Sequence, residues 1–258
     1  MKKLLSLTLS IIMVIGLVAC GNSVKTGNVP ENPKNDNSQK NKLVMCTNAE
    51  FPPYEYKDGG EYVGIDVEVS KLIGEKLGVE VEILDIAFDS LIPTVTSGKA
   101  DFAMAGMTVT EDRKEFVDFT HTYQSAVQSV ALPANSEIST IDDLNGKKIG
   151  VQLGTTGDIY CSGDYGDDAI ERYPKIIDGF QAMKSGKIDA VVVDDQVARN
   201  IVDQEPNTYK LLDTKYADEE YAIAVRKGNT ELLDKLNKAI DEIKASGDLQ
   251  RIIDKYIQ

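Results

Sequence analysis

Most side chains of this chain that could do chemistry are carboxylates. Histidine and cysteine, the usual ligands of transition metals and common catalytic groups, are scarce. The 258 residues contain one histidine and three cysteines, against 42 aspartates and glutamates. A single histidine leaves little for a zinc site or a histidine-assisted nucleophile. Three cysteines are too few for a disulfide scaffold, and we expect no disulfide between Cys46 and Cys161. We therefore predict no metal site, no cofactor and no histidine-assisted catalytic residue.

Polar residues follow two apolar strands that share a local pattern. Residues 97–101 (Ser-Gly-Lys-Ala-Asp) and 185–189 (Ser-Gly-Lys-Ile-Asp) agree at four of five positions, and each precedes such a strand. Helix-to-strand turns favour glycine and polar residues in any protein, but this agreement favours two related lobes. Ligands of open α/β sheets bind beyond the carboxyl ends of strands. We therefore expect residues 106–108 (Gly-Met-Thr) and 194–195 (Asp-Asp) to line one cleft.

The elements that would position these residues alternate between strand and helix patterns, which indicates α/β sheets with helical crossovers. Apolar runs and alternation predict strands over residues 43–47, 79–84, 101–105, 148–151 and 190–193. Helical periodicity, often followed by glycine, predicts helices over residues 65–77, 88–97, 179–185, 230–246 and 249–256.

The N-terminus has the pattern of a bacterial lipoprotein signal peptide. Lys2 and Lys3 precede an apolar run over residues 4–18, and Leu17-Val18-Ala19 leads directly to Cys20. An ordinary signal peptide or a buried helix would also be apolar here. We predict a signal peptide over 1–19, then a lipidated Cys20 and a flexible tether over 20–42, poor in apolar residues. The protein is then extracytoplasmic, anchored to the outer face of the cell membrane.

Composition excludes several other classes. The formal charge is −14 with 42% hydrophobic residues, and the isoelectric point is about 4.6. Such an acidic chain repels phosphate backbones, so we expect no nucleic-acid partner. A near-average composition argues against a disordered, fibrous or multi-span membrane protein.

Six motifs occur in order along the chain. They are 47–55 (TNAEFPPYE), 62–68 (YVGIDVE), 88–93 (FDSLIP), 105–114 (AGMTVTEDRK), 117–120 (VDFT) and 150–158 (GVQLGTTGD). Together they resemble the polar amino-acid-binding receptors of ATP-binding-cassette importers, bacterial extracellular solute-binding protein family 3. The resemblance runs from about Leu43 to the C-terminus. It implies transport of a free amino acid by delivery to an ATP-binding-cassette permease, without enzyme activity.

The resemblance also implies an architecture. It is the type II periplasmic-binding-protein-like fold, in which two α/β lobes are joined by two hinge strands. Lobe 1 would comprise residues 43–123 and 222–258, and lobe 2 residues 124–221. By the same resemblance the crossovers lie near 123–127 and 218–222, and we expect a monomer.

The family's ligand positions match particular residues of this chain. Arg113 matches the arginine that holds the ligand α-carboxylate, and Asp194 matches the acid that receives the α-ammonium. Thr108 and Thr156, with backbone N–H groups around Gly106 and Thr155, match further donors to the carboxylate. Phe51 and Phe88 match the positions beside the ligand side chain. The full predicted set is Asn48, Phe51, Phe88, Gly106, Met107, Thr108, Arg113, Gln152, Thr155, Thr156 and Asp194.

Each assignment has an alternative from the residues alone. Arg113 would otherwise be a solvated helix residue paired with Glu111 or Asp118, and Asp194 a helix N-cap. The two phenylalanines would be core residues and the two threonines turn residues. Asn48 replaces an aspartate found in some family members, which weakens the case for a strictly cationic ligand; basic and polar neutral amino acids both remain open.

At the level of function, two other classes stay open. One is an extracytoplasmic enzyme of the same fold, such as a dehydratase or a lytic transglycosylase, which needs a positioned acid or base. The other is a ligand-sensing or adhesion lipoprotein at the cell surface.

Overall fold

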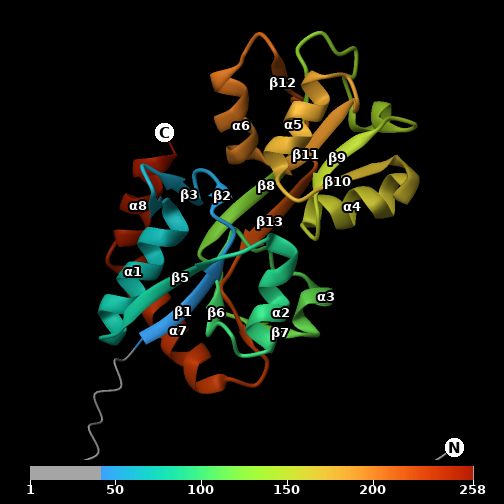
Figure 1. Ribbon diagram of the computed structural model, residues 1–258. Helices are drawn as coiled ribbons and strands as arrows, with labels where there is room; N and C mark the ends of the chain where they lie inside the picture. Colours follow the sequence, from blue (N-terminus) through green and yellow to red (C-terminus); the bar gives the residue numbers. More distant parts are fainter. Residues whose placement is uncertain (1–41, 258) are drawn as a thin grey trace, which may run out of the picture. The chain divides into compact units, whose positions relative to one another are not determined.

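The computed structural model describes residues 42–257, which belong to one compact unit. The predicted signal peptide, Cys20 and nearly all of the predicted tether lie outside the described residues. Two α/β lobes, each built on its own sheet, make up the described chain (Figure 1). Among these residues, no helix is long and apolar enough to cross a membrane.

Lobe 1 is built on a five-stranded sheet. Its strand order is β5 (Glu80–Asp85), β1 (Lys42–Thr47), β6 (Phe102–Ala103), β14 (Ala224–Arg226) and β7 (Val117–Phe119). Strand β1 is parallel to both of its neighbours, whereas β14 is antiparallel to both of its own. A small antiparallel sheet, β2 (Glu50–Phe51), β3 (Glu55–Asp58) and β4 (Glu61–Val63), follows β1 along the chain.

Helices cover both faces of this sheet because its strands carry apolar side chains on alternate sides. Met45 packs with helices α1 (Ile65–Leu77), α7 (Thr230–Ala245) and α8 (Asp248–Tyr256). The next residue, Cys46, packs with α2 (Leu91–Thr96) on the opposite face. The C-terminal helices therefore complete the lobe that the N-terminal strands begin. A short helix, α3 (Glu111–Lys114), precedes β7.

Lobe 2 is built on a second mixed sheet. Its strand order is β10 (Ile170–Tyr173), β9 (Ile149–Gln152), β11 (Ala190–Asp194), β8 (Gln124–Pro133) and β12 (Tyr209–Leu211). Helices α5 (Ile176–Lys184) and α6 (Asp195–Gln204) pack on one face, and α4 (Thr156–Tyr165) packs on the other. Two short 3₁₀ helices, η2 (Ile141–Leu144) and η3 (Asp167–Ala169), join these elements.

Two paired strands connect the lobes. Strand β8 leads from lobe 1 into lobe 2, and β13 (Ala217–Tyr221) leads back (Figure 1). They pair antiparallel from Gln124↔Tyr221 to Gln128↔Ala217. We call β8 and β13 the hinge strands.

Two expected elements differ from the structure, for identifiable backbone reasons. The helix expected over 88–97 is divided into η1 (Phe88–Ser90) and α2, because Pro93 has no N–H to donate to the carbonyl four residues earlier. The strand expected over 101–105 pairs only at Phe102–Ala103. Beyond it, Gly106 turns the chain at φ 49° and donates its N–H to Asp66 Oδ2 (2.8 Å) instead of a strand.

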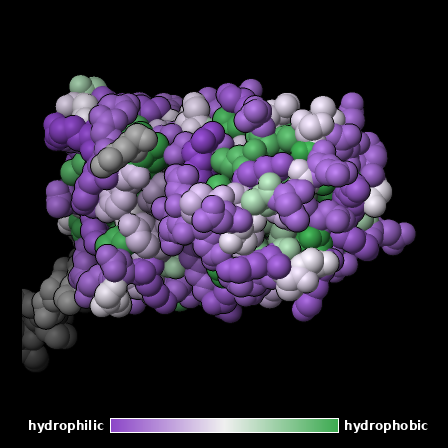
Figure 2. Space-filling view, turned by 90° about the horizontal axis from the view of Figure 1, so that it is seen from above, coloured by the Kyte–Doolittle hydropathy of each residue, from purple (hydrophilic) through white to green (hydrophobic). Residues whose placement is uncertain are grey.

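The surface is mainly polar. Figure 2 shows one face on which hydrophilic residues predominate and hydrophobic ones form small separate groups. Among the described residues, the exposed large hydrophobic side chains are Phe116, Leu153, Ile159 and Ile177. Cys46 and Cys161 are buried in the cores of different lobes, and neither is disulfide-bonded.

Candidate functional site

A small cavity of about 20 Å³ lies between the lobes and is lined by residues of both. Its lining residues are Asn48, Phe51, Glu55, Phe88, Gly106, Thr108, Arg113, Gln128, Gln152, Thr155, Thr156 and Tyr221. That volume holds about one water molecule, so an amino acid could enter only if the lobes move apart. Nine of the eleven residues predicted from the sequence are thus brought together, and the other two are Met107 and Asp194.

Arg113 places a buried positive charge at this cavity. Thr110 caps α3 by accepting the N–H of Arg113 (3.2 Å), so the side chain projects from the first turn. Its guanidinium donates to the Thr108 carbonyl (2.8 Å) and, across the lobes, to the Gly154 carbonyl (3.2 Å). Burial lowers the pKa of Arg113 from its usual value, but an arginine remains charged. The Arg113 side chain is buried, and within residues 42–257 it forms no ion pair with Glu111 or Asp118. It is therefore not the solvated, paired arginine of the alternative interpretation.

Asp194 stands directly behind the cavity. Its Oδ1 accepts the N–H groups of Gln196 and Val197 at the start of α6, so the helix cap given as the alternative for this residue is present. Its Oδ2 accepts the hydroxyls of Tyr221 (2.8 Å) and Tyr54 (3.4 Å). Burial raises the pKa of Asp194 to about 7. Tyr221 lines the cavity and Asp194 does not, so their hydrogen bond connects the Asp194 carboxylate to the cavity wall.

Met107 differs from the sequence-based expectation. Its side chain is buried in the lobe 1 core with Leu91 and Val117, and its carbonyl accepts the N–H of Ala222. The neighbours Gly106 and Thr108 face the cavity. Thr108 forms an antiparallel β-bridge with Tyr221, and the side chain of the preceding residue of such an extended chain points to the opposite side.

Polar contacts hold the lobes together around the cavity. Gln152 Nε2 of lobe 2 donates to Asn48 Oδ1 of lobe 1 (2.8 Å), and Lys175 forms an ion pair with Glu50. Thr155 caps α4, and Thr156 is its first helical residue. The N-terminal end of α4 carries the positive end of a helix dipole, and it lies on the same cavity as Arg113.

Aromatic rings form the apolar side of the cavity. Phe51 stacks on Tyr54 with ring centroids 5.8 Å apart, and Tyr54 meets Tyr221 edge-on at 5.2 Å. The Phe88 ring lies 5.5 Å from the Arg113 guanidinium carbon. A Cβ added at Gly106 would come within 3.0 Å of the Phe51 ring, so glycine is required for this close approach.

Glu55, which the sequence analysis did not single out for the site, places a buried carboxylate at the cavity. It is 1% exposed, and neither carboxylate oxygen has a hydrogen-bond partner among the described residues. Burial first, and the neighbouring charge of Asp66 second, raise the pKa of Glu55 well above its usual value. Asp66 in turn accepts the N–H of Gly106 and the hydroxyl of Tyr123, each at 2.8 Å. Burial raises the pKa of Asp66 to about 6.

These buried carboxyls predict a pH dependence of stability. Because the pKa values of Asp66 and Asp194 are about 6 and about 7 against an ordinary 3.8, the folded state binds protons more tightly than the unfolded state. Their contribution to stability is full below the unfolded pKa and is lost as pH rises through the folded pKa. We expect the ligand-free protein to have a lower free energy of unfolding at about pH 8 than at about pH 5.5, measured by urea denaturation.

The control for this prediction is Asp66→Asn. The amide oxygen can still accept from Gly106 and Tyr123, while the titrating group is removed. The variant should therefore show a shallower loss of stability over the same pH interval. An unchanged slope in Asp66→Asn, or stability that rises with pH, would contradict the assignment.

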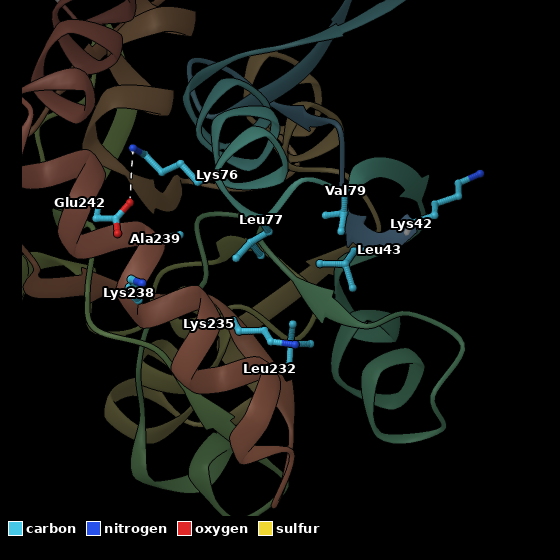
Figure 3. Close-up of a pocket in the computed structure, with 10 residues that line it drawn as sticks. All are labelled: Lys42, Leu43, Lys76, Leu77, Val79, Leu232, Lys235, Lys238, Ala239 and Glu242. Atoms are coloured by element: carbon cyan, nitrogen blue, oxygen red, sulfur yellow. Dashed lines mark ion pairs between the residues drawn. The ribbon is translucent and has the colours of Figure 1, made fainter. Parts of the chain in front are cut away.

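A second, larger cavity of about 460 Å³ has a different character (Figure 3). It lies within lobe 1, between α1, α7 and the start of β1. Lys42, Lys76, Lys235 and Lys238 surround an apolar floor that includes Leu43 and Leu232. Neither Arg113 nor Asp194 lines this cavity. It is therefore not a candidate for the site of the ligand between the lobes. Nor do residues 42–257 contain a group of three or more His, Cys, Asp or Glu arranged for a metal ion.

Comparison with known proteins identifies the family. The family model for bacterial extracellular solute-binding proteins, family 3, matches residues 43–258. The chain belongs to this family. It is 36% identical over 261 residues to the arginine-binding extracellular protein ArtP of Bacillus subtilis (strain 168), covering 99% of this chain and 98% of that protein. It is 33% identical over 263 residues to a probable histidine-binding protein of Neisseria gonorrhoeae, covering 99% and 96%.

Solved structures of the family agree with the fold. An ancestral arginine-binding protein bound to arginine matches with a TM-score of 0.80 at 42% identity, covering 84% of this chain and 99% of that one. The arginine-, lysine-, histidine-binding protein ArtJ from Geobacillus stearothermophilus matches with a TM-score of 0.80 at 30% identity, covering 84% and 95%. The predicted two-lobed periplasmic-binding-protein-like fold is confirmed. So is the expectation that the chain is an extracellular solute-binding protein of amino-acid transport and not an enzyme.

Proposed function

We propose that this family member binds one free amino acid, basic or polar, between its lobes and delivers it to an ATP-binding-cassette permease. One observation carries the proposal: the cavity is lined by a buried cation, Arg113, which forms no ion pair in the described residues, and by the buried carboxyl group of Glu55, whose oxygens have no hydrogen-bond partner there. Uncompensated buried charges are costly. The anionic group of a zwitterionic ligand would pair with Arg113, and its cationic group would stabilise the ionised form of Glu55, whose pKa burial raises.

The two ends of the amino acid would be bound by different parts of the site. The Arg113 fork and the N-terminal end of α4, at Thr155 and Thr156, suit the α-carboxylate. Negative charge for the cationic groups would come from Asp194 and Glu55. The relatives named as arginine- and histidine-binding proteins support a basic ligand, and the glutamine-binding protein GlnH of Bacillus subtilis supports a polar neutral one.

The remaining predicted residues would enclose the ligand side chain. Phe51 and Phe88 would flank it, and an aromatic face also favours a cation. The contact between Asn48 and Gln152 would close the cavity across the lobes. Because direct contacts already join the lobes, the described arrangement corresponds to a closed state, and ligand entry requires them to separate about the hinge strands. We propose lobe boundaries at residues 123/124 and 221/222, and a monomer.

Anchoring forms a separate part of the proposal. Cleavage before Cys20 and lipidation of that cysteine would hold the receptor at the outer face of the cell membrane, with residues 20–42 as a tether. Mass spectrometry of the membrane-extracted protein should give an acylated N-terminus at Cys20. A mature protein that begins elsewhere, without acyl chains, would contradict it.

Titration of the purified protein tests the binding function. Calorimetry should show binding of L-arginine or a related basic or polar amino acid. The α-N-acetyl and α-carboxamide forms of the same compound should bind at least about tenfold more weakly, because each removes one of the two charges. Equal binding of the blocked forms would contradict recognition of a free amino acid.

A further inference from the structure

Glu219 is a buried carboxylate on a hinge strand that neither the motifs nor the cavity lining includes. It lies in the middle of β13, is 6% exposed, and accepts two hydrogen bonds at Oε2. The donors are Thr108 Oγ1 (3.1 Å) and Gln128 Nε2 (2.9 Å). Thr108 belongs to lobe 1 and Gln128 to the other hinge strand, and both line the cavity. Glu219 therefore links the hinge to two residues of the site.

The hydrogen bonds to Glu219 determine whether Thr108 and Gln128 can donate hydrogen bonds to a ligand or accept them from it. A carboxylate accepts hydrogen bonds and donates none. The single hydroxyl proton of Thr108 is therefore used on Glu219, and only its lone pairs remain. Gln128 directs its amide N–H₂ at Glu219, so its Oε1 points elsewhere; that oxygen is buried and has no partner in the described residues.

We infer that Glu219 is a positioning residue that makes Thr108 and Gln128 hydrogen-bond acceptors in the ligand cavity. The inference rests on the proposed amino-acid-binding function and refines it. This wall would receive donor groups of the ligand, its ammonium or a basic side chain, whereas the resemblance assigned Thr108 to the carboxylate. The charge of Glu219 also acts on Arg113, whose pKa it raises against the effect of burial.

The next residue of the same strand provides a matched control. Glu220 is exposed, and its side chain points to the opposite side of β13 from Glu219. Glu219→Gln and Glu220→Gln make the same chemical change one position apart. A glutamine at 219 can both donate and accept, so Thr108 and Gln128 would no longer be held as acceptors.

Calorimetric titration with L-arginine tests the inference. Wild type and Glu220→Gln should bind equally, and Glu219→Gln at least about tenfold more weakly. In a background that carries both Thr108→Val and Gln128→Met, the loss caused by Glu219→Gln should fall below about threefold, since Glu219 would act through these two residues. A merely structural role would give the same loss in both backgrounds.

Further outcomes are also decisive. Gln128→Met removes the second acceptor at similar length and should weaken binding at least about tenfold even if Glu219→Gln fails to fold. Binding within about threefold of wild type for Glu219→Gln, or for Gln128→Met, would overturn the inference while the receptor function stands. Failure of the wild type to bind any free amino acid would instead overturn the proposed function, and the inference with it.

Discussion

Replacing Arg113 with alanine is expected to weaken binding of the free amino acid by about a hundredfold to a thousandfold or more. The guanidinium is buried against both lobes, through the carbonyls of Thr108 and Gly154. Its removal would leave the ligand carboxylate in a closed site without a counter-charge, a change that costs about 3–5 kcal/mol. Calorimetric titration of Arg113→Ala with L-arginine measures the loss directly.

Two further variants make this test specific. Arg113→Lys keeps the charge but not the planar fork, so it should bind more weakly than wild type and more tightly than Arg113→Ala. Arg251→Ala is the control, because Arg251 is an exposed arginine of α8 that forms an ion pair with Asp248. If Arg113→Ala bound L-arginine within about tenfold of wild type, Arg113 would not be the carboxylate anchor.

Local sequence determined much of the fold. The first helix was expected over residues 65–77 and is observed as α1, Ile65–Leu77, followed by Gly78 at φ 66°. Its apolar positions repeat with the helical period, and a left-handed residue that ends a helix favours glycine. The start of α5 was expected at Gly179, but the helix begins at Ile176. Lys175 precedes it without a side-chain cap, so the sequence carries no signal for that boundary.

The residues of the candidate site were predictable where one short motif also holds them together in space. Arg113 and Thr108 lie in one short segment, and α3 and its cap bring them together locally. Glu55 was missed as a site residue although it lies in the first motif, because its position depends on a hairpin. In the pairing of β2 with β3, Phe51 faces Glu55. Recognising that hairpin around the two prolines would have placed Glu55 beside a predicted site residue.

The other missed residues depend on contacts distant in sequence. Gln128 and Tyr221 come from the two hinge strands, whose pairing brings residues 124–128 against 217–221. Neither strand carries a local feature that specifies its partner. Likewise, the hydrogen bond between Asp194 and Tyr221 follows from the packing of both lobes on the hinge.

Replacing Glu55 with glutamine is expected to reduce the affinity for L-arginine by about a hundredfold, with little change for L-glutamine. The Glu55 carboxylate is buried, lines the cavity, and has no partner among residues 42–257. Because its pKa is raised mainly by burial, it favours the protonated form in the empty site, and a cationic ligand would stabilise the ionised form. A neutral amide cannot supply that charge, and losing one partner of a buried charge pair costs about 2–5 kcal/mol.

The contrast between ligands separates charge recognition from a packing defect. Glu61→Gln is the matched control, since Glu61 begins β4 of the same small sheet and is exposed. That variant should bind both amino acids as the wild type does. A Glu55→Gln variant that lost L-arginine and L-glutamine equally would show that Glu55 supports the shape of the cavity. Unchanged binding of L-arginine would show that the ligand's positive charge is neutralised elsewhere, with Asp194 the remaining candidate.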